Sequence, residues 1–249
     1  MGITFSEVPA AFGTFHLAAL GIIVLASALL FPLLKKLPEE KLLRLLGILG
    51  AAMLAAEVWK QWFVFRYVYE GALSTWFFPW QLCSMSMYLS FLAPFLRGKA
   101  RDTALSFLAS FSLLAAVFAL VFPGDMLRPQ ILLFCHSFLF HGVMIVESLA
   151  AILLLRRRER PPFLPVLWLY LGMAAAAELI NVVSHRLIED RRLASNMFNI
   201  TPYYPSTQPV FHDIALRLGI LPEILIYLAL IALGSWGLFR LACAERKKR

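Results

Sequence analysis

Long apolar runs dominate the chain, and short polar or proline-containing connections separate them. Each run has roughly 20 residues, the length that an α-helix needs to cross ~30 Å of hydrocarbon at ~1.5 Å per residue. The pattern predicts seven membrane-spanning helices, at residues 13–34, 42–65, 77–96, 103–122, 130–155, 163–183 and 220–239. We therefore expect an all-α, polytopic membrane helical bundle.

The predicted spans leave no room for a separate soluble domain, so residues 1–249 are expected to form a single transmembrane domain. The longest connection is 184–219, which is rich in Asn, Pro, Tyr and charged residues. Its length predicts a lid or a partly re-entrant segment over one face of the membrane.

Composition excludes a soluble globular domain. Hydrophobic residues make up 61% of the 249 residues and charged residues only 15%, and the mean hydropathy is +0.76. Soluble domains have about a quarter of their residues charged. The apolar surface of this chain is therefore expected to face lipid.

The basic residues predict the orientation. Sixteen of the 23 Lys and Arg residues fall in alternate connections on one side, so the positive-inside rule places the N-terminus outside and the C-terminus inside. The net charge of +8 then reflects topology and attraction to anionic headgroups, with no nucleic acid partner.

The first span lacks a basic n-region and a small-residue cleavage site, so we expect it to be retained. The compact Arg-rich connections, without a eukaryotic targeting signal, predict a multi-pass protein of the bacterial inner membrane.

A thiol and an imidazole are predicted to lie at the same depth. Cys83, in the run Pro79-Trp80-Gln81-Leu82-Cys83-Ser84, and His136, in Phe134-Cys135-His136-Ser137, each lie six residues below the outer end of a span. At ~1.5 Å per residue both are ~9 Å deep. Ionisable groups are costly in a bilayer unless they are paired or hydrated, so a shared depth favours one polar cavity. Other polar residues of this outer half, or of the long connection on the same side, are Glu57, Glu178, Asn181, His185, Asn196, Asn199, His212 and Asp213.

Each of these residues also has an ordinary structural interpretation. A lone Cys in a membrane span is usually a small hydrophobic residue, and His136 could instead bond a carbonyl group or bridge two helices. His141 is five residues after His136, which rotates it ~140° around a helix and predicts a structural role. Glu147 lies near the inner half and is not explained by an outer cavity. Three cysteines are too few for a disulfide framework, although a Cys83–Cys135 bridge remains an alternative.

The outer Pro-x-x-Leu-Cys-Ser run, the His-Ser pair early in a later span and the Asn-rich connection before the last span resemble the bacterial YwaF-type proteins and the transmembrane protein 164 family. The resemblance covers most of the chain. The eukaryotic members are regarded as acyltransferases that move a fatty acyl chain between phospholipids through a cysteine. The resemblance implies that Cys83 is the nucleophile, that His136 is the base, and that Asn181 and Asn196 match polar positions of the last third. The family commonly has a His two residues before the cysteine, and this chain has Gln81, which can donate a hydrogen bond but is no proton acceptor.

The implied chemistry needs no cofactor and no metal. A thiolate formed by loss of its proton to His136 would attack an ester carbonyl and leave an acyl thioester on Cys83. The partners would be membrane phospholipids or lysophospholipids. Gln81, Asn181 and Asn196 are the candidates for holding the oxyanion or positioning the substrate, with Glu57, Glu178, His185 and His212 as supporting residues.

Two other classes of function stay open. A non-catalytic transporter or binding protein would also use a polar outer vestibule with a lid. A metal or haem protein would use the histidines together with Cys83, Met85 and Met87. Those three sulfur residues step ~200° apart on a helix, which prevents them from facing one ion together.

Overall fold

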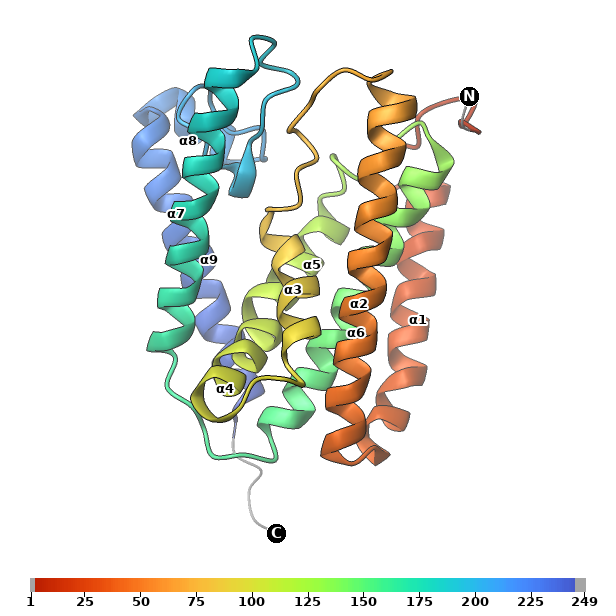
Figure 1. Ribbon diagram of the computed structural model, residues 1–249, viewed down its shortest axis with the longest axis vertical. Coiled ribbons are helices and arrows are strands. Elements are labelled where there is room, and N and C mark those ends of the chain that lie inside the picture. The colour runs from red at the N-terminus through yellow and green to blue at the C-terminus, as the bar shows by residue number, and fades with distance from the viewer. Residues whose placement is uncertain (1–2, 245–249) are drawn as a thin grey trace.

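The computed structural model describes residues 3–244, and the regular secondary structure in that range is helical apart from one isolated β-bridge between Thr4 and Gln130. Six helices are long and apolar enough to cross a membrane. They are α1 (Thr14–Lys36), α2 (Glu39–Phe63) with its terminal π-helical turn, α4 (Gly98–Phe107) continued by α5 (Leu113–Val121), α6 (Ile131–Leu155), α7 (Leu164–Leu187) and α9 (Ile220–Ala242). Figure 1 shows them running along the long axis of the molecule. The prediction of an all-α membrane bundle is confirmed.

The third expected span differs from the prediction. Its helix covers only Leu82–Leu92, made of a 3₁₀ turn and α3 (Met85–Leu92), whereas the hydropathy pattern predicted residues 77–96. Residues 72–81 are not helical, and the amide of Thr75 donates to the Leu193 carbonyl, 2.9 Å away, in a distant loop. Non-helical backbone is tolerated at membrane depth where protein surrounds it. Residues 3–244 therefore contain six helices of spanning length, and a short helix takes the place of the third expected span.

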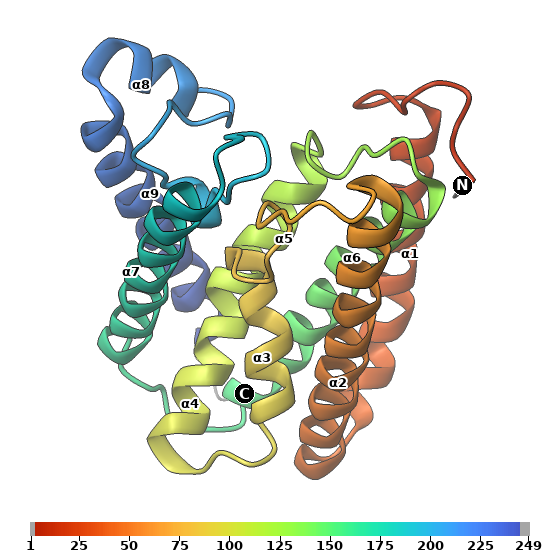
Figure 2. The same cartoon turned by 45° about the horizontal axis from the view of Figure 1, so that its top comes forward.

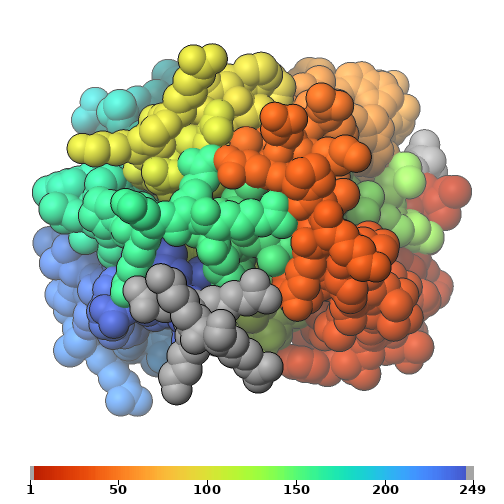
Figure 3. Space-filling view, turned by 90° about the horizontal axis from the view of Figure 1, so that it is seen from below, coloured from red at the N-terminus to blue at the C-terminus, as the bar shows by residue number. Residues whose placement is uncertain are grey.

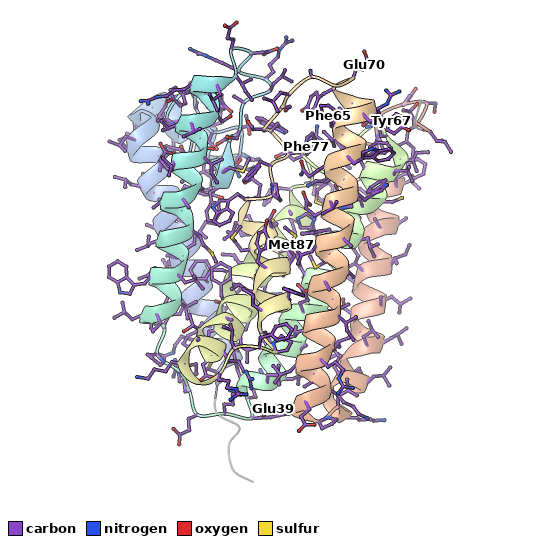
Figure 4. All side chains as sticks on the ribbon, in the orientation of Figure 1. Glu39, Phe65, Tyr67, Glu70, Phe77 and Met87 are labelled. Atoms are coloured by element: carbon purple, nitrogen blue, oxygen red, sulfur yellow. The ribbon has the colours of Figure 1, made fainter. Side chains whose placement is uncertain are left out.

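The chain still travels the full length of the bundle at this point. It descends from the upper end of α2 as the non-helical segment, and α3 continues toward the lower end, where α4 begins (Figures 1 and 2). The described chain starts at the upper end, near the top of α6, and α9 finishes at the lower end. Glu70 marks the upper end and Glu39 the lower end in Figure 4.

The lower end is closed by short connections. Figure 3 views it from below and shows the segments that join α1 to α2, α3 to α4 and α6 to α7 lying side by side in orange, yellow and green. Arg158 ties them together through ion pairs with Glu39 and with Asp102, the latter at 2.9 Å. Burial of the guanidinium opposes its charge, but the hydrogen bonds to these two carboxylates outweigh burial and raise the pKa of Arg158.

The connection after α7 is packed into the upper end. It begins at Ile188, and its central residues, from Ala194 to Phe198, are buried. The short amphipathic helix α8 (Phe211–Leu218) follows and leads into α9. Backbone hydrogen bonds from Thr75 and Trp76 to Leu193 join this connection to the non-helical segment before α3. Two non-helical stretches, far apart in the sequence, thus pack together above the short helix.

Candidate functional site

A cavity of about 550 Å³ lies in the upper half of the bundle, next to the short helix. Its walls come from α2, the segment before α3, α5, α6, α9 and the connection after α7. Cys83 and His136 both line it. The structure therefore places the predicted thiol and imidazole in the lining of one cavity. The 3₁₀ turn that precedes α3 begins at Leu82, one residue before Cys83.

The backbone around Cys83 is fixed on both sides. Cys83 lies in the 3₁₀ turn Leu82–Ser84, and the amide of Ser84 donates to the Gln81 carbonyl at 2.8 Å. The Tyr88 hydroxyl donates to the Pro79 carbonyl at 2.9 Å and ties the preceding segment to α3. The Cys83 side chain is partly exposed to the cavity.

The three cysteines are free thiols, so the alternative of a Cys83–Cys135 bridge is wrong. Cys135 lies on an exposed face of α6, whereas the neighbouring His136 faces the cavity. Consecutive residues of a helix point ~100° apart, which explains why adjacent residues separate in this way.

His136 presents a free ring nitrogen. Its ring packs against Trp59 of α2, at 5.9 Å between centroids, and against Phe140, at 5.8 Å. Nε2 is buried and has no hydrogen-bond partner among the described residues. A neutral imidazole with the proton on the other nitrogen would make Nε2 an acceptor.

His141, for which we expected a structural role, also lines the cavity. Its Nδ1 lies 2.7 Å from the Ser137 carbonyl oxygen, one turn earlier on α6. His136 and His141 point ~140° apart, as on a regular α-helix, but the cavity is wide enough for both side chains to line it. His141 is thus a second imidazole of the site.

An ion pair stands on the α2 wall. Glu57 is buried and lies 2.7 Å from the Lys60 ammonium, and the Gln61 amide donates to the same carboxylate at 2.6 Å. Both Glu57 and Lys60 line the cavity. Lys60 lies in the last turn of α2. The i, i+3 spacing of an acidic and a basic residue was the signal for this pair.

Two amide side chains hold the loop that roofs the site. Gln81 donates to the Asn196 carbonyl at 2.9 Å and accepts from the Phe198 amide at 2.8 Å. Asn181 donates to the Met197 carbonyl at 3.1 Å and accepts from the amide of the same residue at 2.6 Å. Phe198 has a left-handed φ of 57°. These bonds from two different elements hold the strained turn 196–199 in place.

Asn196 keeps one group free. Its Oδ1 accepts from the Thr201 amide at 3.1 Å, while Nδ2 is buried and without a partner among the described residues. Asn196 lines the cavity, and so does Gln81, but Asn181 does not. Of the three predicted positioning amides, Asn196 is therefore the one that lines the cavity and has an unpartnered donor.

The remaining predicted residues lie elsewhere. Glu178 is half-buried on α7, and His185 stacks on Tyr203 at 4.3 Å between ring centroids. His212 is exposed on α8, with Nδ1 2.9 Å from the Ser206 carbonyl oxygen. None of the three lines the cavity. Within residues 3–244, no group of three or more His, Cys, Asp and Glu side chains is arranged to hold a metal ion.

Glu147 belongs to the core below the cavity. It is fully buried on α6, accepts a hydrogen bond from the Ser86 hydroxyl of α3, and has no partner for Oε1 among the described residues. We expect Glu147→Ala to lower the free energy of unfolding by about 1–3 kcal/mol, because Ser86 loses its acceptor in a dry environment. Glu147→Gln keeps an acceptor and should cost less. Chemical unfolding in detergent measures both, and equal losses would contradict this role for the hydrogen bond.

The fold and the cavity together define the class of protein. It is a multi-pass helical membrane protein in which a thiol and an imidazole line one cavity. The sequence profile of the TMEM164 family matches residues 11–240, so the chain belongs to that family. This confirms the resemblance inferred from the sequence. Comparisons with curated proteins and with solved structures gave no match.

Proposed function

We propose that the protein is an integral membrane acyltransferase that moves a fatty acyl chain between phospholipid or lysophospholipid molecules through a thioester on Cys83. The observation that carries the proposal is the cavity itself. Cys83, His136 and Asn196 all line it, and both His136 Nε2 and Asn196 Nδ2 lack a hydrogen-bond partner among the described residues. A nucleophile, a base and a hydrogen-bond donor are the three parts that acyl transfer needs.

The first half of the reaction forms the thioester. His136 Nε2 takes the proton of Cys83 as Sγ attacks the ester carbonyl carbon, and Asn196 Nδ2 donates to the developing oxyanion. The carbon–oxygen ester bond then breaks, and the departing lysolipid oxygen takes the proton from His136. In the second half, His136 removes the proton of an acceptor hydroxyl, whose oxygen attacks the thioester. The sulfur leaves as a thiolate and recovers the proton.

The apolar wall suits the acyl chain. Leu114 and Phe118 of α5 face the cavity together with Leu230 and Ile231 of α9. Phe118 and Leu230 are about half exposed, 48% and 49%, so this wall has apolar surface available for an acyl chain. We place the site in the outer leaflet of a bacterial inner membrane, with the N-terminus outside and the C-terminus inside.

A non-catalytic transport or binding function is the second candidate. The cavity wall also carries Glu57, Lys60, Asp125 and Arg128, and charged groups of both signs are typical of vestibules that bind polar solutes. Such a protein would need no covalent intermediate. Detection of an acyl enzyme separates the two functions.

Incubation with a phospholipid carrying an alkyne-tagged acyl chain should label Cys83 through a hydroxylamine-sensitive bond, located by peptide mass spectrometry. Cys83→Ala should lose the label, because the attacking sulfur is absent. Cys135→Ser and Cys243→Ser are the matched controls and should keep it, since neither residue lines the cavity. A wild-type protein that binds the tagged lipid but stays unlabelled would exclude the thioester route.

A further inference from the structure

Two cationic side chains from separate elements lie beside the same aromatic ring. Lys60 of α2 has its ammonium 5.8 Å from the centroid of Phe77, and Arg128, in the connection between α5 and α6, has its guanidinium carbon 4.9 Å from that centroid. All three residues line the cavity. Phe77 lies nearer the upper end of the bundle than Met87 (Figure 4), and Cys83 falls between these two residues in the sequence. The cations are therefore on the upper side of the thiol.

Both cations keep hydrogen-bond donors free. The Lys60 ammonium has three N–H donors, and Glu57 is its one carboxylate partner in the described structure. Arg128 donates through Nε to the Asp125 backbone carbonyl at 2.9 Å, and its two terminal nitrogens donate to no protein group within residues 3–244. That single bond fixes the direction of the guanidinium and leaves its paired donors unused.

One carboxylate of this region pairs with Lys60, and none pairs with Arg128 among the described residues. Glu57 shares its oxygen between Lys60 and the Gln61 amide, which donates at 2.6 Å. Asp125 lines the cavity, and Arg128 donates to its backbone carbonyl rather than to its carboxylate. Arg128 therefore has no carboxylate partner among the described residues, and its partly exposed guanidinium is open to an anion.

We infer that Lys60 and Arg128 form a binding site for the phosphate group of a glycerophospholipid. A guanidinium binds two phosphate oxygens at once, and a lysine ammonium adds a point charge. The site would hold the phosphate above Cys83, so that the glycerol ester lies at the thiol and the acyl chain lies between α5 and α9. The phosphate site stands on its own geometry, while the presentation of an ester to Cys83 rests on the proposed function. A diacylglycerol has the same esters and chains but lacks the phosphate, and it should bind weakly.

The test measures binding in a Cys83→Ala background, in which no acyl transfer occurs. Short-chain phosphatidylcholine, the matched diacylglycerol and inorganic phosphate are titrated against the purified full-length protein in detergent. We expect phosphatidylcholine to bind about 100-fold tighter than diacylglycerol, and Lys60→Gln and Arg128→Gln each to reduce this preference about 10-fold, as for loss of a charged hydrogen bond. Lys41→Gln and Arg217→Gln, at exposed positions outside the cavity lining, are the controls and should change nothing.

Each outcome is decisive. Equal affinity for both lipids would overturn the phosphate site, as would variants that weaken both lipids equally. Inorganic phosphate that binds as tightly as phosphatidylcholine would assign the site to free phosphate and overturn the lipid headgroup. If Lys60→Gln fails to fold, Arg128→Gln still tests the phosphate site. Arg128 is on a connection, and the one hydrogen bond of its side chain in the described structure is to a backbone carbonyl. If the phosphate preference is found and no thioester forms on the wild-type protein, only the proposed chemistry fails.

Discussion

Replacement of His136 by Gln is expected to slow acylation of Cys83 by about 10²–10⁴-fold, the usual contribution of a general base. The glutamine amide can fill much of the space of the imidazole and can bond its neighbours, but it cannot accept the proton of the thiol. Cys83 would then react mainly as the neutral thiol, which is a poor nucleophile. The measurement is the single-turnover rate of thioester formation with a tagged phospholipid.

His141→Gln is the matched control for this experiment. It removes the other imidazole of the cavity, whose Nδ1 lies against the Ser137 carbonyl oxygen. We expect its acylation rate to fall much less than that of His136→Gln. If His141→Gln were the slower variant, His141 would be the base and the assignment of His136 would be wrong. Equal rates for both variants and the wild type would mean that no imidazole takes the proton.

The sequence predicted the spanning helices well because one strong effect determines them. Burial of about 20 apolar residues in hydrocarbon dominates every local preference, so α1, α6 and α9 lie close to their predicted ranges. Residues 72–81 are not helical: the amides of Thr75 and Trp76 donate to the Leu193 carbonyl, and those of Phe78 and Trp80 form local turns. The bonds to Leu193 depend on a contact more than 100 residues away, which hydropathy along the chain does not contain. The same cause shortens the third helix.

The sequence predicted how deep the site residues lie in the membrane, but not which of their side chains face the cavity. Equal depth correctly brought Cys83, His136 and Glu57 to one cavity, because depth follows directly from position along a helix. It wrongly grouped Glu178 and His185 with them, since these residues on α7 do not line the cavity. Which side of a helix faces the centre depends on the packing of all its neighbours.

The amide side chains of Gln81 and Asn181 also show that the sequence does not reveal what a side chain contacts. Gln81 and Asn181 were expected as donors to a substrate, and the structure shows them bonded to the backbone of the loop 196–198. The unpartnered donor is the Nδ2 group of Asn196, and the hydrogen bonds of Gln81 and Asn181 hold the loop around it. An amide side chain in a sequence carries no information on whether its partner is protein or ligand. A glutamine at position 81 has a physical role here, because it binds both a carbonyl and an amide of the loop.

Replacement of Gly50 by Ala is expected to destabilise the protein by about 1–3 kcal/mol, the usual cost of overpacking a tight contact. Gly50 on α2 is buried against α3, and an alanine Cβ would overlap the Phe91 backbone nitrogen and come within 2.8 Å of the Met87 carbonyl oxygen. These atoms belong to backbone and cannot rotate away. Small residues at helix interfaces in membranes permit such close approach. Thermal and chemical unfolding in detergent measure the loss.

Gly21→Ala on α1 is the matched control, because no atom lies within 4 Å of the Cβ it would add. It should be neutral or stabilise the protein by about 0.5–1 kcal/mol, as for a glycine removed from a helix interior. The Gly50 variant should also acylate more slowly, since α3 follows directly from the turn that holds Cys83 and would be pushed away from α2. Normal stability together with normal acylation would show that α3 can shift without cost. The short helix would then not be what positions the thiol opposite His136.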